Sequence, residues 1–197
     1  MNAQGGTDFV CDGEADAFVK ARALLSMLPL NNLEEAPLDT AEDLNRVCEG
    51  LTAGADAKTI LSALCDVGSV LEFGAGYSQA VTALCKMGGR TVAVVHTGAG
   101  ELCNKRAKKI ARFVRFADCY NIPVVTLVDT EGLMVAESAR QQELLSAVAQ
   151  MMFAYTEATT AKISVVTGKA VGAAYVALGG KANADVVYAW PGSVIAP

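Results

Sequence analysis

The feature that most constrains the fold is an apolar run followed at once by a turn of very small residues. Residues 163–167 form the run, and residues 168–175 contain two glycines and three alanines. This order predicts a buried strand that leads directly into a helix beginning near Gly172. Because the turn has almost no side chains, the backbone N–H groups of Ala173 and Ala174 are bare at a helix N-terminus. Such donors can hold a developing negative charge, although a Gly/Ala-rich junction can also serve close packing alone.

The rest of the chain alternates between strand and helix patterns. A hairpin is expected at Gly88 and Gly89 because both residues tolerate positive φ, although the Ala-rich stretch before it could also be helical. Beyond this hairpin, strands alternate with helices, which predicts a parallel sheet with right-handed crossovers. Strands are expected at residues 70–73, 80–87, 91–96, 124–128, 162–167, 185–188 and 193–196, and helices at 16–27, 56–65, 105–117, 137–156 and 171–178.

The length of 197 residues suits one α/β domain with a substantial core. Residues 1–13 are expected to be disordered or tag-like, and residues 14–54 to form an N-terminal helix followed by a polar, turn-rich linker arm. The folded domain is expected to cover residues 55–197, with Asp56 as the N-cap of its first helix.

Charge and composition exclude several classes of function. The net charge of -5 argues against nucleic acid as a partner, and no apolar run is long enough to span a membrane. With an acidic, polar N-terminus, these features predict a cytoplasmic protein. The six cysteines are scattered and the only histidine is His96, so no metal site is expected. A basic helix is either a solvated face or a patch for an anionic partner; its cations are Lys105, Arg106, Lys108, Lys109, Arg112 and Arg115.

Three other patterns invite catalytic interpretations. The glycines at 98 and 100 suggest a dinucleotide-binding loop, but Cys103 stands where the third glycine is needed, so a plain loop is favoured. Asp129 and Glu131 follow a buried strand, where they could act as acid and base or serve as loop caps. His96 has no nucleophile partner and is interpreted as a structural or surface residue.

Several motifs, in a fixed order, resemble the carboxyltransferase component of biotin-dependent acyl-CoA carboxylases and decarboxylases. They are ARFVRFAD at 111–118, NIPVV at 121–125, EAT at 157–159, KISVV at 162–166, KAVGAAY at 169–175 and ADVVYAWP at 184–191. Upstream, residues 24–32 resemble the interdomain arm of this family and residues 88–92 its first hairpin. The resemblance runs from about Phe18 to Pro197.

This resemblance implies a crotonase-like fold built from repeated ββα units. Family enzymes have two such domains, an N-terminal one for the acyl-CoA and a C-terminal one for biotin, and their active site lies between domains of two subunits. The chain resembles only the C-terminal, biotin-side domain. The family continues with helices beyond the segment that matches residues 193–197, which implies a C-terminal truncation.

The family moves a carboxyl group between carboxybiotin and the α-carbon of an acyl-CoA, with peptide N–H groups holding the anions that arise. The resemblance places the biotin-side donors at Gly172, Ala173 and Ala174. It places substrate contacts at Asp129, Gly132, Lys169, Tyr175 and Val176. It also implies a short acyl-CoA of the malonyl, methylmalonyl or propionyl type, a biotin carrier protein, an acyl-CoA-binding N-domain or subunit, and a homo-oligomer.

The chain departs from the family pattern at two places. The usual Asp-x-Pro-Gly-Phe reads Asp129-Thr-Glu-Gly-Leu133, and Val176 replaces an acidic residue that is frequent in carboxylases. The second change favours a decarboxylase-type or divergent member. Two alternatives therefore remain: a non-catalytic assembly subunit or fragment of such a complex, and a crotonase-type hydratase or isomerase that uses Asp129 or Glu131.

Overall fold

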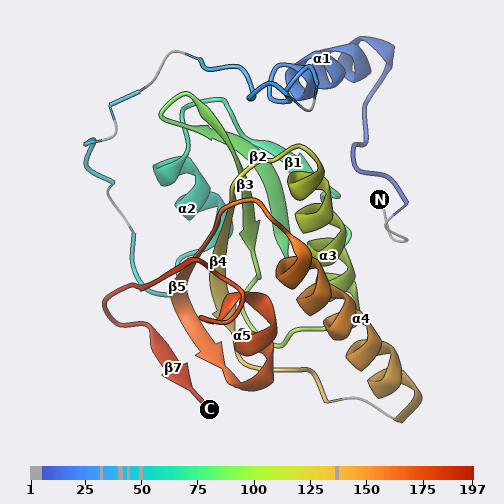
Figure 1. Cartoon of the computed structure of the whole chain (residues 1–197), viewed down its shortest axis with the longest axis vertical. Coiled ribbons are helices and arrows are strands. Elements are labelled where there is room, and N and C mark those ends of the chain that lie inside the picture. The colour runs from blue at the N-terminus through green and yellow to red at the C-terminus, as the bar shows by residue number, and fades with distance from the viewer. Residues whose placement is uncertain (1–5, 32, 40–41, 44, 49–50, 136–137) are drawn as a thin grey trace.

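The computed structural model describes residues 6–31, 33–39, 42–43, 45–48, 51–135 and 138–197. Its centre is a seven-stranded sheet in the order β1-β2-β3-β4-β5-β6, with β7 paired beside β5 (Figure 1). The strands are β1 Leu71–Phe73, β2 Val81–Met87, β3 Arg90–His96, β4 Val124–Thr130, β5 Lys162–Val171, β6 Val186–Ala189 and β7 Val194–Ala196. The helices are α1 Glu14–Leu25, α2 Ala57–Leu64, α3 Asn104–Cys119, α4 Ser138–Glu157 and α5 Gly172–Gly179.

The sheet is antiparallel at one edge and parallel through the rest. β1, β2 and β3 form antiparallel pairs, and the β2–β3 turn uses Gly88 and Gly89 at φ values of 60° and 77°. From β3 to β6 every pair is parallel. The predicted hairpin and the predicted parallel region are both confirmed, and residues 81–87 form a strand and not the alternative helix.

Successive residues of each strand point to opposite faces of the sheet, and each face has its own core. Ala93 and Val95 of β3 pack in the cluster that α3 and α4 cover, whereas Val94 packs with α2. Helix α3 buries Ile110, Phe113, Val114 and Ala117 at helical spacing, as its sequence predicts. Helix α2 begins after Asp56, whose carboxylate accepts a hydrogen bond from Thr59 N at 2.9 Å, which confirms the expected N-cap.

The arm before α2 runs against the domain at defined points. Asp39 N donates to Gly89 O at 3.0 Å, and the Asp39 carboxylate pairs with Lys86 Nζ at 2.9 Å. Further along, the Arg46 guanidinium donates to the carbonyl oxygens of Ala63 and Cys65 at 3.0 and 2.6 Å. These contacts attach the polar arm to the β2–β3 hairpin and to the C-terminal end of α2.

The segment before α1 also contacts the domain. The Phe9 ring lies 4.8 Å from the Phe73 ring, and Asp8 O accepts a hydrogen bond from Gly74 N at 2.8 Å. These contacts are not expected of a disordered or tag-like segment, which is what the sequence predicts for residues 1–13. Residues 1–5 of that range lie outside the described residues. Within the part of the chain that the structure describes, no helix has the length and apolarity to cross a membrane.

Strand β5 differs most from its expectation. It continues to Val171, whereas the sequence predicts that the strand ends at Thr167. The extra residues stay extended because β7 pairs with them: Lys169 faces Val194, Ala170 faces Ile195 and Val171 faces Ala196. The strand therefore reaches the first residue of α5 with no intervening loop.

We expect Asp66→Ala to loosen the β2–β3 hairpin. The buried Asp66 carboxylate accepts hydrogen bonds from Gly88 N at 3.0 Å and Gly89 N at 2.7 Å, so its removal leaves one buried and one half-buried donor without their acceptor. The free energy of unfolding in urea should fall by about 1–3 kcal/mol. Asp66→Asn, which keeps one acceptor oxygen, should lose less; equal losses for the two variants would contradict this assignment.

Candidate active site

A bulge in β5 lies at the centre of the candidate site. Val128 of β4 pairs with Val166 and Thr130 pairs with Ala170, so the single residue Asp129 faces three residues of β5. A bulge of this kind bends its strand and leaves backbone groups without ladder partners. Here Thr167 Oγ1 donates to Val128 O at 3.2 Å, and Thr167 O accepts from Gly54 N at 2.9 Å.

The Asp129 carboxylate occupies the remaining space of the bulge. Its Oδ1 accepts a hydrogen bond from Lys169 N at 2.8 Å. A Cβ added to Gly168 would lie 2.4–2.8 Å from the three carboxylate atoms, so the carboxylate itself requires glycine at this position. Thr97 fixes the Asp129 backbone from the other side, donating to its O at 2.9 Å and accepting from its N at 2.8 Å. Asp129 is buried, so it acts as a positioning residue for the bulge.

The chain turns sharply from the bulge into α5. Val171 is still extended, with φ −115° and ψ 132°, and Gly172 has φ 60°, a conformation that favours glycine. The Ala173 side chain is exposed and that of Ala174 is fully buried. In the described part of the chain, no acceptor outside the helix takes a hydrogen bond from the N–H of Ala173 or Ala174. These donors belong to the four that a helix leaves unpaired at its start.

The other end of α5 is held by Asn183. Its side-chain Nδ2 donates to Val176 O at 3.2 Å, and its Oδ1 accepts from Thr156 Oγ1 of α4 at 3.1 Å. Gly179 lies so close to the sheet that a Cβ there would be 3.1 Å from Ser164 Oγ. The helix axis is thereby fixed against both α4 and β5, which keeps its N-terminus in place beside the bulge.

Around the bulge, the remaining predicted site residues occupy different environments. Lys169 Nζ pairs with Glu131 Oε1 at 2.6 Å on the surface, which raises the pKa of the lysine and lowers the pKa of the glutamate. Tyr175 packs against Val128, Val166 and Ala170, whereas Val176 is exposed. Asp129 and Glu131 both bind Lys169, one its N–H and the other its ammonium.

Gly132 lies in a loop that pairs with the loop of residues 98–103. It has φ 120°, and its carbonyl accepts a hydrogen bond from Leu102 N at 2.8 Å. The neighbouring Arg106 guanidinium donates to Gly98 O and Ala99 O, each at 3.0 Å. The Gly-x-Gly loop is therefore held by α3 through two of its carbonyls and by the Gly132 loop through Leu102 N, which favours the plain loop over a dinucleotide-binding loop.

His96 is buried at the end of β3. Its Nδ1 accepts a hydrogen bond from Gly98 N at 3.0 Å, and its Nε2 has no hydrogen-bond partner among the described residues. Burial lowers the pKa of this imidazole, and the nearby Asp129 carboxylate partly opposes that shift. The structural interpretation of His96 fits this place better than a surface one.

Sequence reasoning missed Thr97, Gly54 and Asn183, which support the site through contacts between distant segments. None of them lies in a motif, and each bonds a partner at least 7 residues away. Of the three, Thr97 alone has a weak signal in the sequence, because it is a polar residue directly after an apolar strand.

Comparison with known proteins identifies the class of this fold. A family model for the carboxyl transferase domain matches residues 1–197, so the chain belongs to that family. A structure of transcarboxylase 12S with hydrolysed methylmalonyl-coenzyme A bound superimposes with a TM-score of 0.88 at 36% identity, covering 96% of this chain and 40% of that one. The predicted crotonase-like α/β fold is thereby confirmed.

Two curated relatives are similar over nearly the whole chain. The alpha subunit of methylmalonyl-CoA decarboxylase from Veillonella parvula is 35% identical over 210 residues, which is 99% of this chain and 41% of the relative. The 12S subunit of methylmalonyl-CoA carboxyltransferase from Propionibacterium freudenreichii subsp. shermanii is 36% identical over 212 residues, 100% and 40% respectively. The chain thus spans about two fifths of the length of these relatives.

We expect Gly168→Ala to destabilise the domain by about 1–3 kcal/mol in urea unfolding, because the added methyl group forces the Asp129 carboxylate out of the bulge. Gly6→Ala is the control, since a Cβ at Gly6 meets nothing within 4 Å and should change the stability little. In an Asp129→Ala background the methyl group no longer meets the carboxylate, so the second substitution should cost markedly less. If the losses of stability of the two single variants simply add in the double variant, the contact between residue 168 and the Asp129 carboxylate would be contradicted.

The pKa of His96 should be measurable directly, because it is the only histidine. We expect an NMR titration to give a pKa below the reference value of 6.5. The unfolded chain then binds this proton more readily than the folded one. The stability linked to His96 is therefore present above pH 6.5 and is lost as the pH falls from there towards the folded-state pKa. A folded-state pKa above 6.5 would contradict a buried neutral imidazole.

Proposed function

We propose that this chain supplies the biotin-side half of the active site of a biotin-dependent acyl-CoA carboxyltransferase. The observation that carries the proposal is the N-terminus of α5, where the N–H groups of Ala173 and Ala174 meet no acceptor outside their helix. Membership of the carboxyl transferase domain family supports the reaction class. The chain would correspond to the C-terminal, biotin-side domain.

The turn fits a planar polar ring such as the biotin ureido group. Gly172 has no side chain, Ala173 and Ala174 have only methyl groups, and Ala173 is exposed, so a ligand oxygen can reach the backbone donors. When bound, carboxybiotin supplies the carboxyl group that is transferred.

The chain's own part in the reaction is electrostatic. The N–H groups of Ala173 and Ala174 donate hydrogen bonds to an oxygen on which negative charge develops, and the positive end of α5 adds to this effect. A donor of this kind contributes about 3–4 kcal/mol in a site that excludes water, since it needs no reorganisation during the reaction. The Asp129 bulge and the Asn183 contact hold the helix so that the two N–H groups keep one direction.

The acyl-CoA would be bound by a partner domain or subunit. The names of the methylmalonyl-CoA relatives support a short acyl group of the malonyl, methylmalonyl or propionyl class. A biotin carrier protein and further copies of the chain complete the proposed assembly, and a cytoplasmic location stays a prediction.

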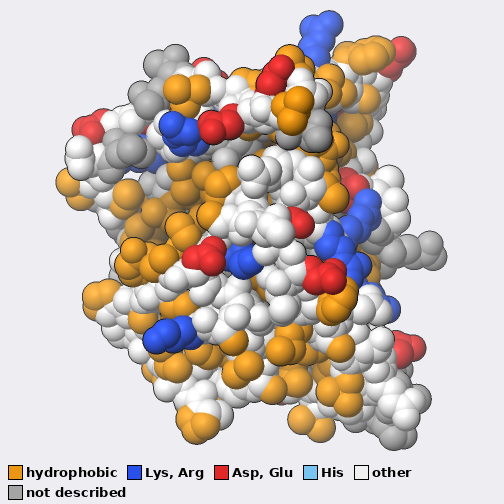
Figure 2. Space-filling model, in the orientation of Figure 1, with side chains coloured by type: hydrophobic (Ala, Val, Ile, Leu, Met, Phe, Trp, Pro, Cys, Tyr) orange, Lys and Arg blue, Asp and Glu red, His pale blue; other side chains and the backbone are white. Residues whose placement is uncertain are grey.

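An apolar surface around α5 and β7 suits such partners. Val176, Val194 and Ile195 are each more than half exposed. Hydrophobic side chains gather over the lower part of the face in Figure 2, where Figure 1 places these elements. Large apolar side chains exposed together are typical of interaction surfaces.

A stand-alone crotonase-type hydratase or isomerase is less well supported. It needs a free carboxylate as acid or base, and both candidates are engaged by Lys169. The ion pair lowers the pKa of Glu131, which makes that carboxylate a weaker base.

We expect Ala173→Pro to lower the rate constant of carboxyl transfer by about 10²–10³, because proline removes one of the two N–H donors. The measurement is transfer from carboxybiotin on a carrier protein, after reconstitution with an acyl-CoA-binding half. Ala173→Gly is the matched control, since it keeps the N–H and should stay within a few-fold of the parent chain.

Unchanged turnover in Ala173→Pro, with native secondary structure by circular dichroism, would contradict the role of the Ala173 N–H as a donor. It would favour the second candidate, an assembly subunit without a catalytic role. The altered sequence at residues 129–133 is the observation that favours that candidate.

A further inference from the structure

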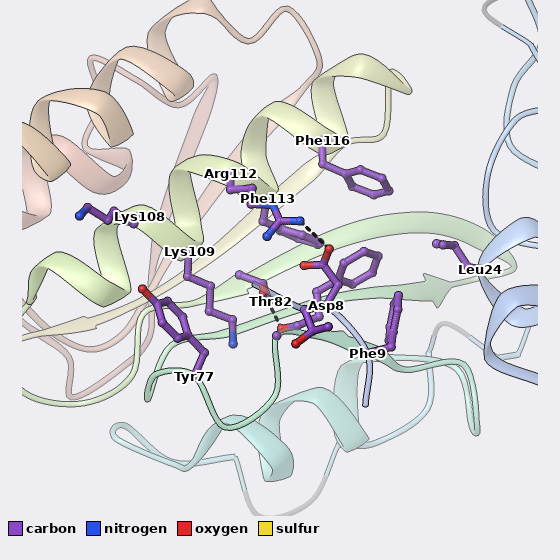
Figure 3. Close-up of a pocket in the computed structure, with 13 residues that line it drawn as sticks. Asp8, Phe9, Leu24, Tyr77, Thr82, Lys108, Lys109, Arg112, Phe113 and Phe116 are labelled. Atoms are coloured by element: carbon purple, nitrogen blue, oxygen red, sulfur yellow. Dashed lines mark hydrogen bonds and ion pairs between the residues drawn. The ribbon is translucent and has the colours of Figure 1, made fainter. Parts of the chain in front are cut away.

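A pocket of about 550 Å³ lies far from α5, between the segment before α1, β1 and helix α3 (Figure 3). This volume is in the range of small-molecule sites. Because β1 and β5 stand on opposite sides of the central strands in the sheet order, the pocket and the α5 turn belong to opposite parts of the domain. None of the residues of the proposed carboxyltransferase site lines it.

One end of the pocket is cationic. Lys108, Lys109 and Arg112 line it from successive turns of α3, and Asp8 is the acid opposite them. Asp8 pairs with Arg112 at 2.6 Å, so the lining side chains carry an excess of positive charge. This set contains half of the basic residues that the sequence singles out on α3, whereas Arg106 instead binds the loop carbonyls at residues 98 and 99.

Lys109 is the buried member of this cationic end. It is 8% exposed, it lines the pocket, and its ammonium donates to Ala80 O at 2.8 Å, which uses one of its three N–H groups. Burial lowers the pKa of this lysine, while Glu72 and Asp8 partly oppose that shift. An anion placed next to a buried ammonium that has one neutral acceptor stabilises the charge of that ammonium.

The other end of the pocket is apolar and aromatic. Phe73 is surrounded by the rings of Phe9, Phe113 and Phe116 at centroid distances of 4.8, 5.2 and 5.2 Å. Figure 3 shows Phe9, Phe116 and Leu24 on one side of the pocket and Tyr77, Lys108 and Lys109 on the other. The lining is therefore divided along its length into a wide apolar part and a short cationic part.

From this division we propose that the pocket binds a carboxylate with an apolar tail, its carboxylate at Lys108 and Lys109 and its tail against the phenylalanine cluster. A neutral apolar molecule leaves the cations without a counter-ion. A highly polar anion such as a nucleotide leaves the aromatic part uncovered, because this part has few free hydrogen-bonding groups: Thr82 Oγ1 already donates to Phe73 O at 3.1 Å. The ligand class therefore follows from charge and from apolar area together.

The test is isothermal titration of sodium decanoate into the full chain at low ionic strength, with decanol as the neutral probe of the same length. We expect saturable binding of one decanoate per chain, with decanol at least tenfold weaker. Lys108→Glu should lower the affinity for decanoate at least tenfold. Arg115→Glu is the matched control, because Arg115 is exposed on the same helix but does not line the pocket, and it should change the affinity less than threefold.

A second variant examines the apolar part. Phe116→Ala removes part of the contact with the tail. It should weaken the binding of decanoate more than that of butyrate, provided that the melting temperature of the variant stays near that of the parent chain. Equal affinity for decanoate and decanol, equal effects of Lys108→Glu and Arg115→Glu, or no saturable binding would each overturn the proposal. Carboxyl transfer is not measured in these titrations, so their outcome is independent of the function proposed for α5.

Discussion

The Asp129 carboxylate in the β5 bulge is the contact on which the geometry of the candidate site depends. It binds Lys169 N–H, excludes any side chain at residue 168, and is itself fixed by Thr97 on β3's C-terminal side. The bulge redirects β5, so that the strand pairs first with β6 and then with β7 before it enters α5.

This arrangement explains why the site has so few reactive side chains. Polar side chains near α5 form hydrogen bonds to the backbone. Asp129 accepts one from the bulge, Thr167 donates one to a carbonyl of β4, and Asn183 donates one to a carbonyl in the C-terminal half of the helix. In the proposed function, the groups that meet the ligand are peptide N–H groups, whose direction is set by the helix. Fixed backbone dipoles of this kind stabilise developing charge without moving, which suits a transfer between two bound groups.

Local patterns predicted much of this fold. The buried strands, the Gly88–Gly89 turn, the Asp56 cap and the apolar face of α3 follow from short-range spacing, and the structure confirms them. The sequence also predicts the strand, turn and helix at residues 162–178, but it ends the strand at Thr167. The sequence could not show that β7 would pair with residues 169–171, since that pairing joins segments that are distant in the chain.

The site could be predicted only as a set of candidate positions. The alanine donors and Asp129 were identified, yet the role of Asp129 depends on a register shift that no local pattern encodes. For the pocket under α3, the sequence left open an anionic partner for the basic residues but did not predict the aromatic part, because Phe9, which completes the aromatic cluster, comes from far upstream in the chain.

In the function that we propose, the N–H groups at the start of α5 are the donors that meet the ligand. The most direct measurement is an NMR titration of d-biotin into the 15N-labelled chain, following every assigned amide. We expect the largest saturable shifts at Ala173 and Ala174, with smaller ones at neighbouring residues of β5 and of the loop at residues 129–133. Saturable shifts confined to other parts of the chain, with these two amides unmoved, would contradict it.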